Sequence, residues 1–130
     1  MDRSENMRRV KSRNTGIELW ARSILWPLGV RYRLHKKNLP GSPDIYVPRL
    51  RVAIFLNGCF WHGHDCRRGR LPTRNKAFWK DKINQNRRRD LTNENRLLTM
   101  DIEPLILWSC QEAQNEVLLR ELACRYYEGR

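Results

Sequence analysis

The sequence of 130 residues lacks any apolar run long enough to cross a membrane, so an integral membrane protein is not expected. Its first residues are charged and contain no apolar signal region, which makes the cytoplasm the expected location. Low-complexity segments and internal repeats are also missing. We therefore expect one domain over residues 1–130, with residues 1–13 forming a basic N-terminal arm.

Acidic residues are few, with 14 Asp and Glu against 26 Lys and Arg, which gives a net charge of +12. Residues 67–89 concentrate this excess, because they contain ten Lys or Arg and a single acid, Asp81. Such a block attracts polyanions, and nucleic acid is the commonest one in the cytoplasm. A solvated helix face would give a similar composition, but the aromatic residues in the same block favour nucleic acid. A membrane surface is disfavoured, since no basic helix has a broad apolar face.

Hydrophobic periodicity predicts an α/β domain in which helices flank a small mixed sheet. A first helix, capped by Asn14 or Thr15, should end at Pro27. Strands are expected at 30–34, 45–47, 51–56 and 105–108, the second and third of them forming a hairpin.

A long helix should begin near residue 73, and a final helix should follow residue 110. The positions expected to be apolar and inward-facing on these two helices are Trp79, Ile83, Leu91 and Leu98 on the first, and Val117, Leu118, Leu119, Leu122, Ala123 and Tyr126 on the second.

Residues 52–66, with the sequence VAIFLNGCFWHGHDC, crowd chemically active side chains at the end of an expected strand. Cys59, His64 and Cys66 have spacing suited to a metal, and Cys110 can supply a fourth ligand from the end of the last strand. Thiolate and imidazole in a tetrahedral set are typical of structural zinc. The alternative is a group of buried thiols and a satisfied histidine. His62 could replace His64 as a ligand, whereas Cys124 is interpreted as a core thiol of the final helix.

Two acids are candidates for a second metal site. Asp44 opens the strand that follows a Pro-Gly turn, where a carboxylate suits Mg²⁺, although it could also close an Asx-turn. Glu18 lies at the start of the first helix, where spacing alone favours a capping role over a metal-site role. Met7, an isolated apolar residue of the arm, could tuck into the core or wedge between bases.

Six motifs follow one another in a single order along the chain. They are RSENM at 3–7, NTGIE at 14–18, LPGSPD at 39–44, FLNGCFWHGHDC at 55–66, TRNKAFWKDKI at 73–83 and WSC at 108–110. Together they resemble the very short patch repair (Vsr) endonucleases, whose nuclease core is of the PD-(D/E)xK type. The resemblance covers nearly the whole chain.

The resemblance implies an enzyme that nicks double-stranded DNA 5′ to the T of a T:G mismatch, left by deaminated 5-methylcytosine, using Mg²⁺. It implies that Asp44 binds Mg²⁺, with the backbone carbonyl of Leu56 and, through water, Glu18. His62 would be the catalytic histidine. The implied zinc ligands are Cys59, His64, Cys66 and Cys110. The implied DNA contacts are Phe60, Trp61 and Trp79, which would wedge into the duplex, together with Met7, Arg74, Lys76 and Lys80. For Trp79 this competes with the core position that its spacing suggests, and the resemblance favours the DNA-facing role.

The sequence departs from the family pattern at Asn57, where family members carry a second active-site histidine. An amide cannot act as a general base, but it can bind a phosphate through hydrogen bonds. The strand at 51–56 also lacks the acid and lysine of the usual motif. We expect a monomer in the cytoplasm, on the bacterial nucleoid, with mismatch-repair proteins as possible partners. The alternatives are a less mismatch-specific nicking enzyme, for example in phage defence, and a zinc-containing DNA-binding module with weak catalysis.

Overall fold

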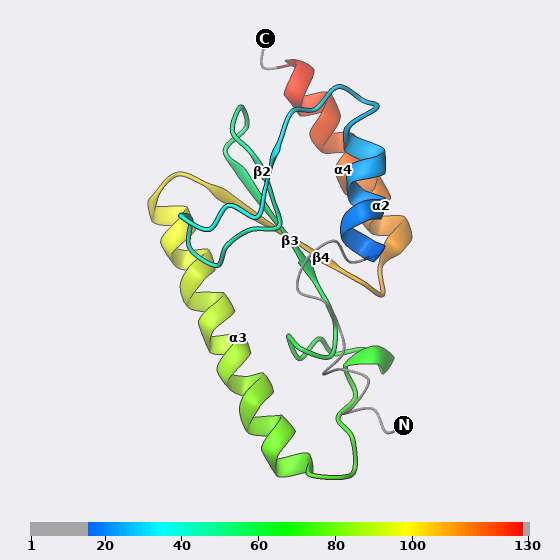
Figure 1. Cartoon of the computed structure of the whole chain (residues 1–130), viewed down its shortest axis with the longest axis vertical. Helices are drawn as coiled ribbons and strands as arrows, with labels where there is room; N and C mark the ends of the chain where they lie inside the picture. Colours follow the sequence, from blue (N-terminus) through cyan, green and yellow to red (C-terminus); the bar gives the residue numbers. More distant parts are fainter. Residues whose placement is uncertain (1–15, 129–130) are drawn as a thin grey trace.

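One four-stranded mixed sheet organises the computed structural model, which describes residues 16–128 (Figure 1). Its strands lie in chain order: β1 (Arg33–Leu34), β2 (Ile45–Val47), β3 (Val52–Asn57) and β4 (Glu103–Trp108). The first three are antiparallel neighbours, whereas β4 pairs with β3 in parallel. The predicted hairpin and the predicted mixed sheet are therefore both confirmed.

Helices cover both faces of this sheet. In Figure 1, α2 (Gly16–Leu25) and α4 (Glu112–Glu128) lie together on one side, and the long α3 (Lys76–Thr99) lies on the other. A short 3₁₀ turn, η1 (Arg67–Gly69), follows β3. None of the helices in this part of the chain is both long and apolar enough to span a membrane. The expected arm, Met7 and the two candidate capping residues of the first helix lie outside the described residues.

The buried strand β3 has one side chain for each face in turn, as its pleat requires. Val52 and Ile54 join the main core with α2 and α4, while Ala53 belongs to a second buried cluster with Leu97 of α3. Because both faces are covered, the strand is apolar throughout. Its end at Asn57 then carries the chain out of the core and into the residues of the site.

The apolar stripe expected on α3 is only half right. Trp79 and Ile83 are buried near the start of the helix, but Leu91 and Leu98 are 60% and 56% exposed, and Leu97 is the residue that packs near the end. The apolar contacts of α3 lie toward its two ends. Between them the helix borders a cleft and meets the loop after β3 through polar side chains, so its middle needs no apolar face.

The final helix buries four of its expected apolar positions: Leu119, Leu122, Ala123 and Tyr126. Val117 is 56% exposed and Leu118 is 37% exposed, contrary to the expectation. Cys124 is also exposed, so its interpretation as a core thiol is wrong. It follows the inward-facing Ala123 by one residue, and a helix turns about 100° per residue, which carries Cys124 out of the buried face.

Candidate functional site

A cleft of about 700 Å³ opens between α2, α3 and the ends of β3 and β4. Besides Trp61, it brings together five residues that the sequence singled out, from three separate segments of the chain. These are Glu18, Asp44, Leu56, Asn57 and His62. The wall formed by α3 adds Arg87, Arg88, Asp90 and Glu94. Acids, a histidine and two guanidinium groups therefore share one solvent-open space.

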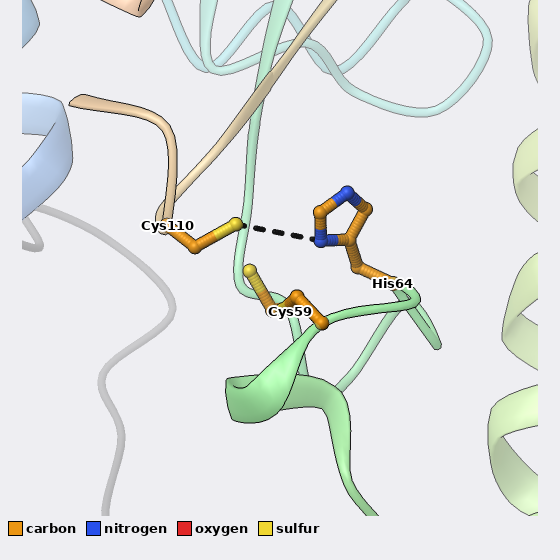
Figure 2. A group of neighbouring side chains, drawn as sticks. Cys59, His64 and Cys110 are labelled. Atoms are coloured by element: carbon orange, nitrogen blue, oxygen red, sulfur yellow. Dashed lines mark hydrogen bonds between the residues drawn. The ribbon is translucent and has the colours of Figure 1, made fainter. Parts of the chain in front are cut away.

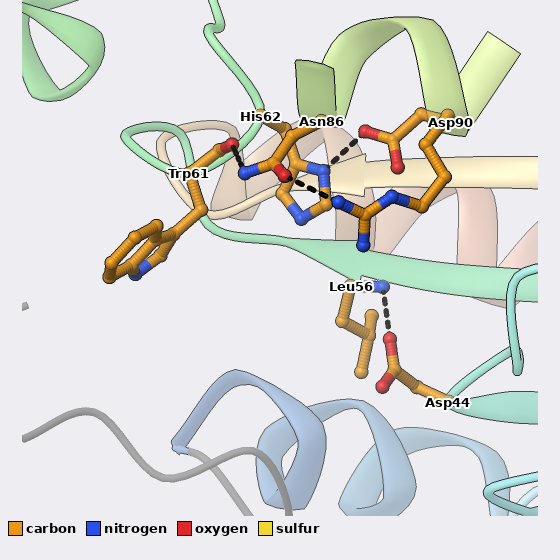
Figure 3. A network of polar contacts seen from close by, with 7 residues as sticks. Asp44, Leu56, Trp61, His62, Asn86 and Asp90 are labelled. Atoms are coloured by element: carbon orange, nitrogen blue, oxygen red, sulfur yellow. Dashed lines mark hydrogen bonds and ion pairs between the residues drawn. The ribbon is translucent and has the colours of Figure 1, made fainter. Parts of the chain in front are cut away.

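Asp44 is held at the edge of the sheet by a bond to the main chain of β3. The amide of Leu56 donates to Asp44 Oδ2 at 2.8 Å, just beyond Ile54, the last residue of β3 that pairs with β2 (Figure 3). The Asp44 side chain thus extends the β2–β3 pairing by one step just before the first residue of β2. Its partner lies twelve positions along the chain, unlike the local partner of an Asx-turn. Burial raises the pKa of Asp44, and the charge of Glu18 raises it further, although the Leu56 bond opposes both.

Glu18 is 1% exposed and lies in the first turn of α2. Its Oε1 lies 2.7 Å from Nε2 of His35 and 3.8 Å from Nη1 of Arg22. The position lies in a helical first turn, as expected, but the carboxylate also lines the cleft and is close enough to affect Asp44. Two carboxylates that repel each other in a buried corner are a donor set suited to a hard divalent cation.

His62 is tied to the middle of α3. Its Nδ1 lies 2.5 Å from Oδ2 of Asp90, and Nδ2 of Asn86 donates to the carbonyl of Trp61 at 2.9 Å (Figure 3). Asn86 and Asp90 are one helical turn apart, so one face of α3 fixes two consecutive residues of the loop after β3. This arrangement leaves Nε2 of His62 as the ring nitrogen available for chemistry.

Sequence reasoning missed Asp90 and Asn86. Positions 79, 83, 86 and 90 recur at intervals of four, three and four, which places them on one face of a helix. Because Trp79 and Ile83 of this series are apolar, the spacing could have predicted that Asn86 and Asp90 face the body of the protein as well. Glu94 was missed as well, and burial together with the charge of Asp90 raises its pKa.

The aromatic residues after β3 form a small core of their own on α3. Phe60 and Trp79 are each 3% exposed, with ring centroids 5.4 Å apart, and Ile83 completes the cluster. Both rings are covered in this arrangement, and the expectation that Phe60 and Trp79 wedge into the duplex stays a prediction. Trp61 is only partly buried and lines the cleft. Packing against the other two rings fixes its position.

Cationic side chains surround the start of α3. Arg74, Lys76 and Lys80 are all exposed there, as a role in binding phosphates requires. Phe78, which the sequence analysis did not single out, is 56% exposed among them and contacts Trp79 edge-on at 5.2 Å. The remaining expected contact, Met7, lies outside the described residues.

The four expected metal ligands meet just beyond the last residues of β3 and β4. One ligand atom from each of Cys59, His64, Cys66 and Cys110 lies within 4.8 Å of the others. Figure 2 shows three of them, with Cys110 Sγ 3.5 Å from His64 Nδ1. The register explains the meeting: Asn57 pairs with Trp108, and each cysteine of the pair 59 and 110 lies two residues beyond.

The thiols of this cluster shift one another's pKa values. Burial would raise the pKa of Cys59, but hydrogen bonds with Ser109 and Cys110 outweigh it, so the pKa is lowered. Loss of hydration and the neighbouring thiols raise the pKa of Cys110 to about 11. A divalent metal would relieve this repulsion, and the donor set could hold one. The ring of His64 is fixed by stacking on Trp108, with centroids 4.3 Å apart.

Known proteins are similar to this sequence over most of its length. Residues 1–68 match the model of the family described as "DNA mismatch endonuclease Vsr". The Type II nicking enzyme V.XorIIP of Xanthomonas oryzae pv. oryzae is 45% identical over 81% of this chain and 77% of its own. V.NmeAIP of Neisseria meningitidis, also a Type II nicking enzyme, is 37% identical over 92% and 84%. The DNA mismatch endonuclease Vsr of Escherichia coli is 39% identical over 92% and 76%.

Proposed function

The chain belongs to the Vsr family of DNA endonucleases, and we propose that it nicks double-stranded DNA 5′ to the T of a T:G mismatch, hydrolysing one phosphodiester bond. The observation that carries this proposal is the shared cleft. It combines a carboxylate pair, Asp44 with Glu18, and an oriented histidine, His62, beside the guanidinium groups of Arg87 and Arg88. A phosphodiester in this cleft would meet cation ligands, a proton-transfer group and positive charge at once.

Asp44 and Glu18 are the residues that would hold Mg²⁺, with the backbone carbonyl of Leu56 as a further oxygen ligand. When bound, the ion would make a water molecule more acidic and neutralise charge that develops on the phosphate. The bond from the Leu56 amide keeps one Asp44 oxygen engaged and orients the carboxylate. The raised pKa of Asp44 supports the assignment, since a cation would relieve the repulsion from Glu18 that contributes to it.

His62 would move the proton. Asp90 engages Nδ1, which fixes the ring and leaves Nε2 to accept a proton from the attacking water or to donate one to the departing oxygen. An imidazole ring can serve as either a base or an acid in such a transfer. Asn57 cannot share this task, because an amide does not titrate, but it lines the same cleft and can donate a hydrogen bond to a phosphate oxygen.

Selectivity for a mismatch would come from the cost of opening the duplex. Trp61 is the ring best placed to insert, with Phe60 and Trp79 supporting it from beneath. Unstacking a base step costs a few kcal/mol, and least where pairing is already poor. A wobble T:G pair is therefore easier to open than a T:A pair. The cationic residues Arg74, Lys76 and Lys80 would add phosphate contacts that do not depend on sequence.

The Cys59, His64, Cys66 and Cys110 cluster would hold structural zinc. Four protein ligands close a tetrahedral shell, so this metal would stabilise the loop that carries Trp61 and His62, leaving catalysis to the cleft. The cytoplasm, at the nucleoid, is the location that follows from a DNA substrate, and mismatch-repair proteins are the partners that a repair role would require.

A less mismatch-specific nicking enzyme is the second candidate function. Several relatives are named Type II nicking enzymes, which favours this second candidate. Both candidates use the same cleft and differ only in which duplex is opened. Because Asn57 stands where the family pattern has a second histidine, a weakly catalytic DNA-binding module is the third candidate.

A nicking assay with the zinc-loaded protein tests the Mg²⁺ chemistry. Labelled duplex DNA would be incubated with wild type and with Asp44→Ala, each with Mg²⁺ and with excess chelator of Mg²⁺. We expect nicked strands only from wild type with Mg²⁺. Binding without nicking under every condition would leave the DNA-binding module, and equal nicking by Asp44→Ala would remove Asp44 from the metal site.

A further inference from the structure

His35 occupies a position that links the two carboxylates of the cleft. Its amide donates to the carbonyl of Asp44 at 3.0 Å, which extends the β1–β2 pairing by one residue. Its side chain reaches the other way, and Nε2 lies 2.7 Å from Oε1 of Glu18. One residue therefore contacts Asp44 through its backbone and Glu18 through its ring.

Both atoms of the ring contact are removed from water. Glu18 Oε1 and His35 Nε2 are each buried and lie 2.7 Å apart, a close contact between a carboxylate oxygen and an imidazole nitrogen that lacks the angle of a hydrogen bond. A buried carboxylate with a poorly matched neighbour would rotate or lose its charge. The close contact with the His35 ring restricts how the Glu18 carboxylate can rotate.

We propose that His35 is a positioning residue for the cation site, whose ring fixes the Glu18 carboxylate relative to Asp44. The backbone supports this role. His35 has a φ of +48°, and its neighbour Lys36 donates a second main-chain bond, to the carbonyl of Pro43 at 3.1 Å. The turn before β2 therefore fixes the ring and the Asp44 backbone as one unit. No feature of the sequence pattern marked this histidine, which lies in a stretch expected to be a polar loop.

This inference rests on the proposed function, since it assigns a partner to the same cation site. Residues that orient metal ligands typically change metal affinity or activity by about 10- to 100-fold when they are replaced. We therefore expect loss of the ring contact to raise the Mg²⁺ concentration required for half-maximal nicking by about tenfold or more. The maximal nicking rate at saturating Mg²⁺ should fall by a smaller factor than the Mg²⁺ affinity does.

Two amide substitutions separate the ring contact from the backbone conformation. His35→Gln places an amide NH₂ near the position of Nε2, so it should keep most of the Mg²⁺ affinity. His35→Asn tolerates a positive φ better, but its amide reaches only as far as Nδ1, so it should lose affinity. Lys37→Asn puts the same new residue on an exposed position of the same loop and is the matched control.

The readouts are Mg²⁺-dependent nicking and, independently of DNA, binding of Mn²⁺ to the zinc-loaded protein followed by electron paramagnetic resonance. Asp44→Ala defines binding at other sites. Weak Mn²⁺ binding by His35→Asn, with near wild-type binding by His35→Gln and Lys37→Asn, would support the proposal. Equal binding by all three, or better binding by the Asn variant than by the Gln variant, would overturn it. Failure of the wild type to nick would overturn the proposed function instead, while the Mn²⁺ series would still decide the role of His35.

Discussion

Nδ1 of His62 and Oδ2 of Asp90 lie 2.5 Å apart, which joins the loop after β3 to the middle of α3. The carboxylate engages the ring nitrogen that faces away from the proposed chemistry. A base oriented by a third group in this way is a recurring arrangement in hydrolytic sites. Because the pair spans two elements, its geometry depends on how the loop packs against the helix.

Replacing Asp90 by Asn should lower the single-turnover nicking rate by about 10- to 100-fold, because the imidazole loses the partner that fixes its ring. His62→Ala should cost more, about 10²- to 10⁴-fold, since the proton-transfer group itself is removed. Asp81→Asn removes the same charge from an exposed position of α3 and should leave the rate unchanged. A similar loss in both aspartate variants would show that net charge, and not the His62 contact, is responsible.

Asp44→Asn should abolish nicking and yet stabilise the metal-free protein at neutral pH. Burial and Glu18 raise the pKa of Asp44 above its ordinary value of 3.8, so the ionised carboxylate opposes folding. That cost is absent below pH 3.8, where the group is protonated in both states, and it develops as pH rises through the raised pKa. The Asn side-chain oxygen can still accept the bond from Leu56. Thermal melts of both proteins in the presence of a Mg²⁺ chelator measure the difference.

The sign of the pH effect supplies the control for that comparison. The gain in melting temperature of Asp44→Asn should be present at neutral pH and should shrink as the pH is lowered toward 3.8. Added Mg²⁺ should raise the melting temperature of wild type and leave that of the variant unchanged. A variant less stable than metal-free wild type at neutral pH would contradict the account of Asp44.

The Cys59 cluster predicts that zinc stabilises the fold. Cys110→Ser removes one of four ligands and should lower the melting temperature by about 10 °C or more, since a structural zinc contributes several kcal/mol. Chelation of zinc from wild type should do the same. Cys124→Ser changes an exposed thiol outside the cluster and should melt like wild type. Metal analysis should find one zinc in wild type and in Cys124→Ser; a zinc-free wild type with the same melting temperature would refute the assignment.

Trp61→Ala should reduce binding and nicking of a mismatched duplex by about 5- to 100-fold, as expected when one base-stacking contact worth about 1–3 kcal/mol is lost. Binding to a matched duplex, which is governed by phosphate contacts, should change less. Trp26→Ala removes a ring that is 55% exposed and stacked under Arg31, away from the cleft. Gel-shift titrations should separate the two variants. Equal losses on matched and mismatched DNA would exclude a role for Trp61 in mismatch selection.

The fold and the meeting of the four Cys and His side chains could be predicted because they depend on local patterns. The hairpin of β2 and β3 follows from apolar runs bounded by turn residues, and the Cys59 set follows from short spacing plus the end of a parallel strand. Burial on the helices was harder, because it depends on where a helix meets the sheet. Leu91 and Leu98 satisfy the period of α3 but are exposed.

The residues that contact the proposed catalytic groups could not be read from the sequence. His35 reaches Glu18 only because β1 pairs with β2, and Asp90 reaches His62 only because α3 crosses the cleft. Each contact depends on two elements docking, which no local motif encodes. Trp79 is buried, as its apolar spacing suggests, and the DNA-facing role that the family resemblance implies for it stays a prediction.

The most direct test of the proposed function compares T:G with T:A in otherwise identical end-labelled duplexes, with randomised flanking base pairs and saturating Mg²⁺. We predict nicking of the T-containing strand 5′ to the T in the mismatched pool, little cleavage of the matched pool, and no cleavage of either by Asp44→Ala. Equal nicking of the two pools would contradict mismatch selection and leave the less specific nicking enzyme as the function of this cleft.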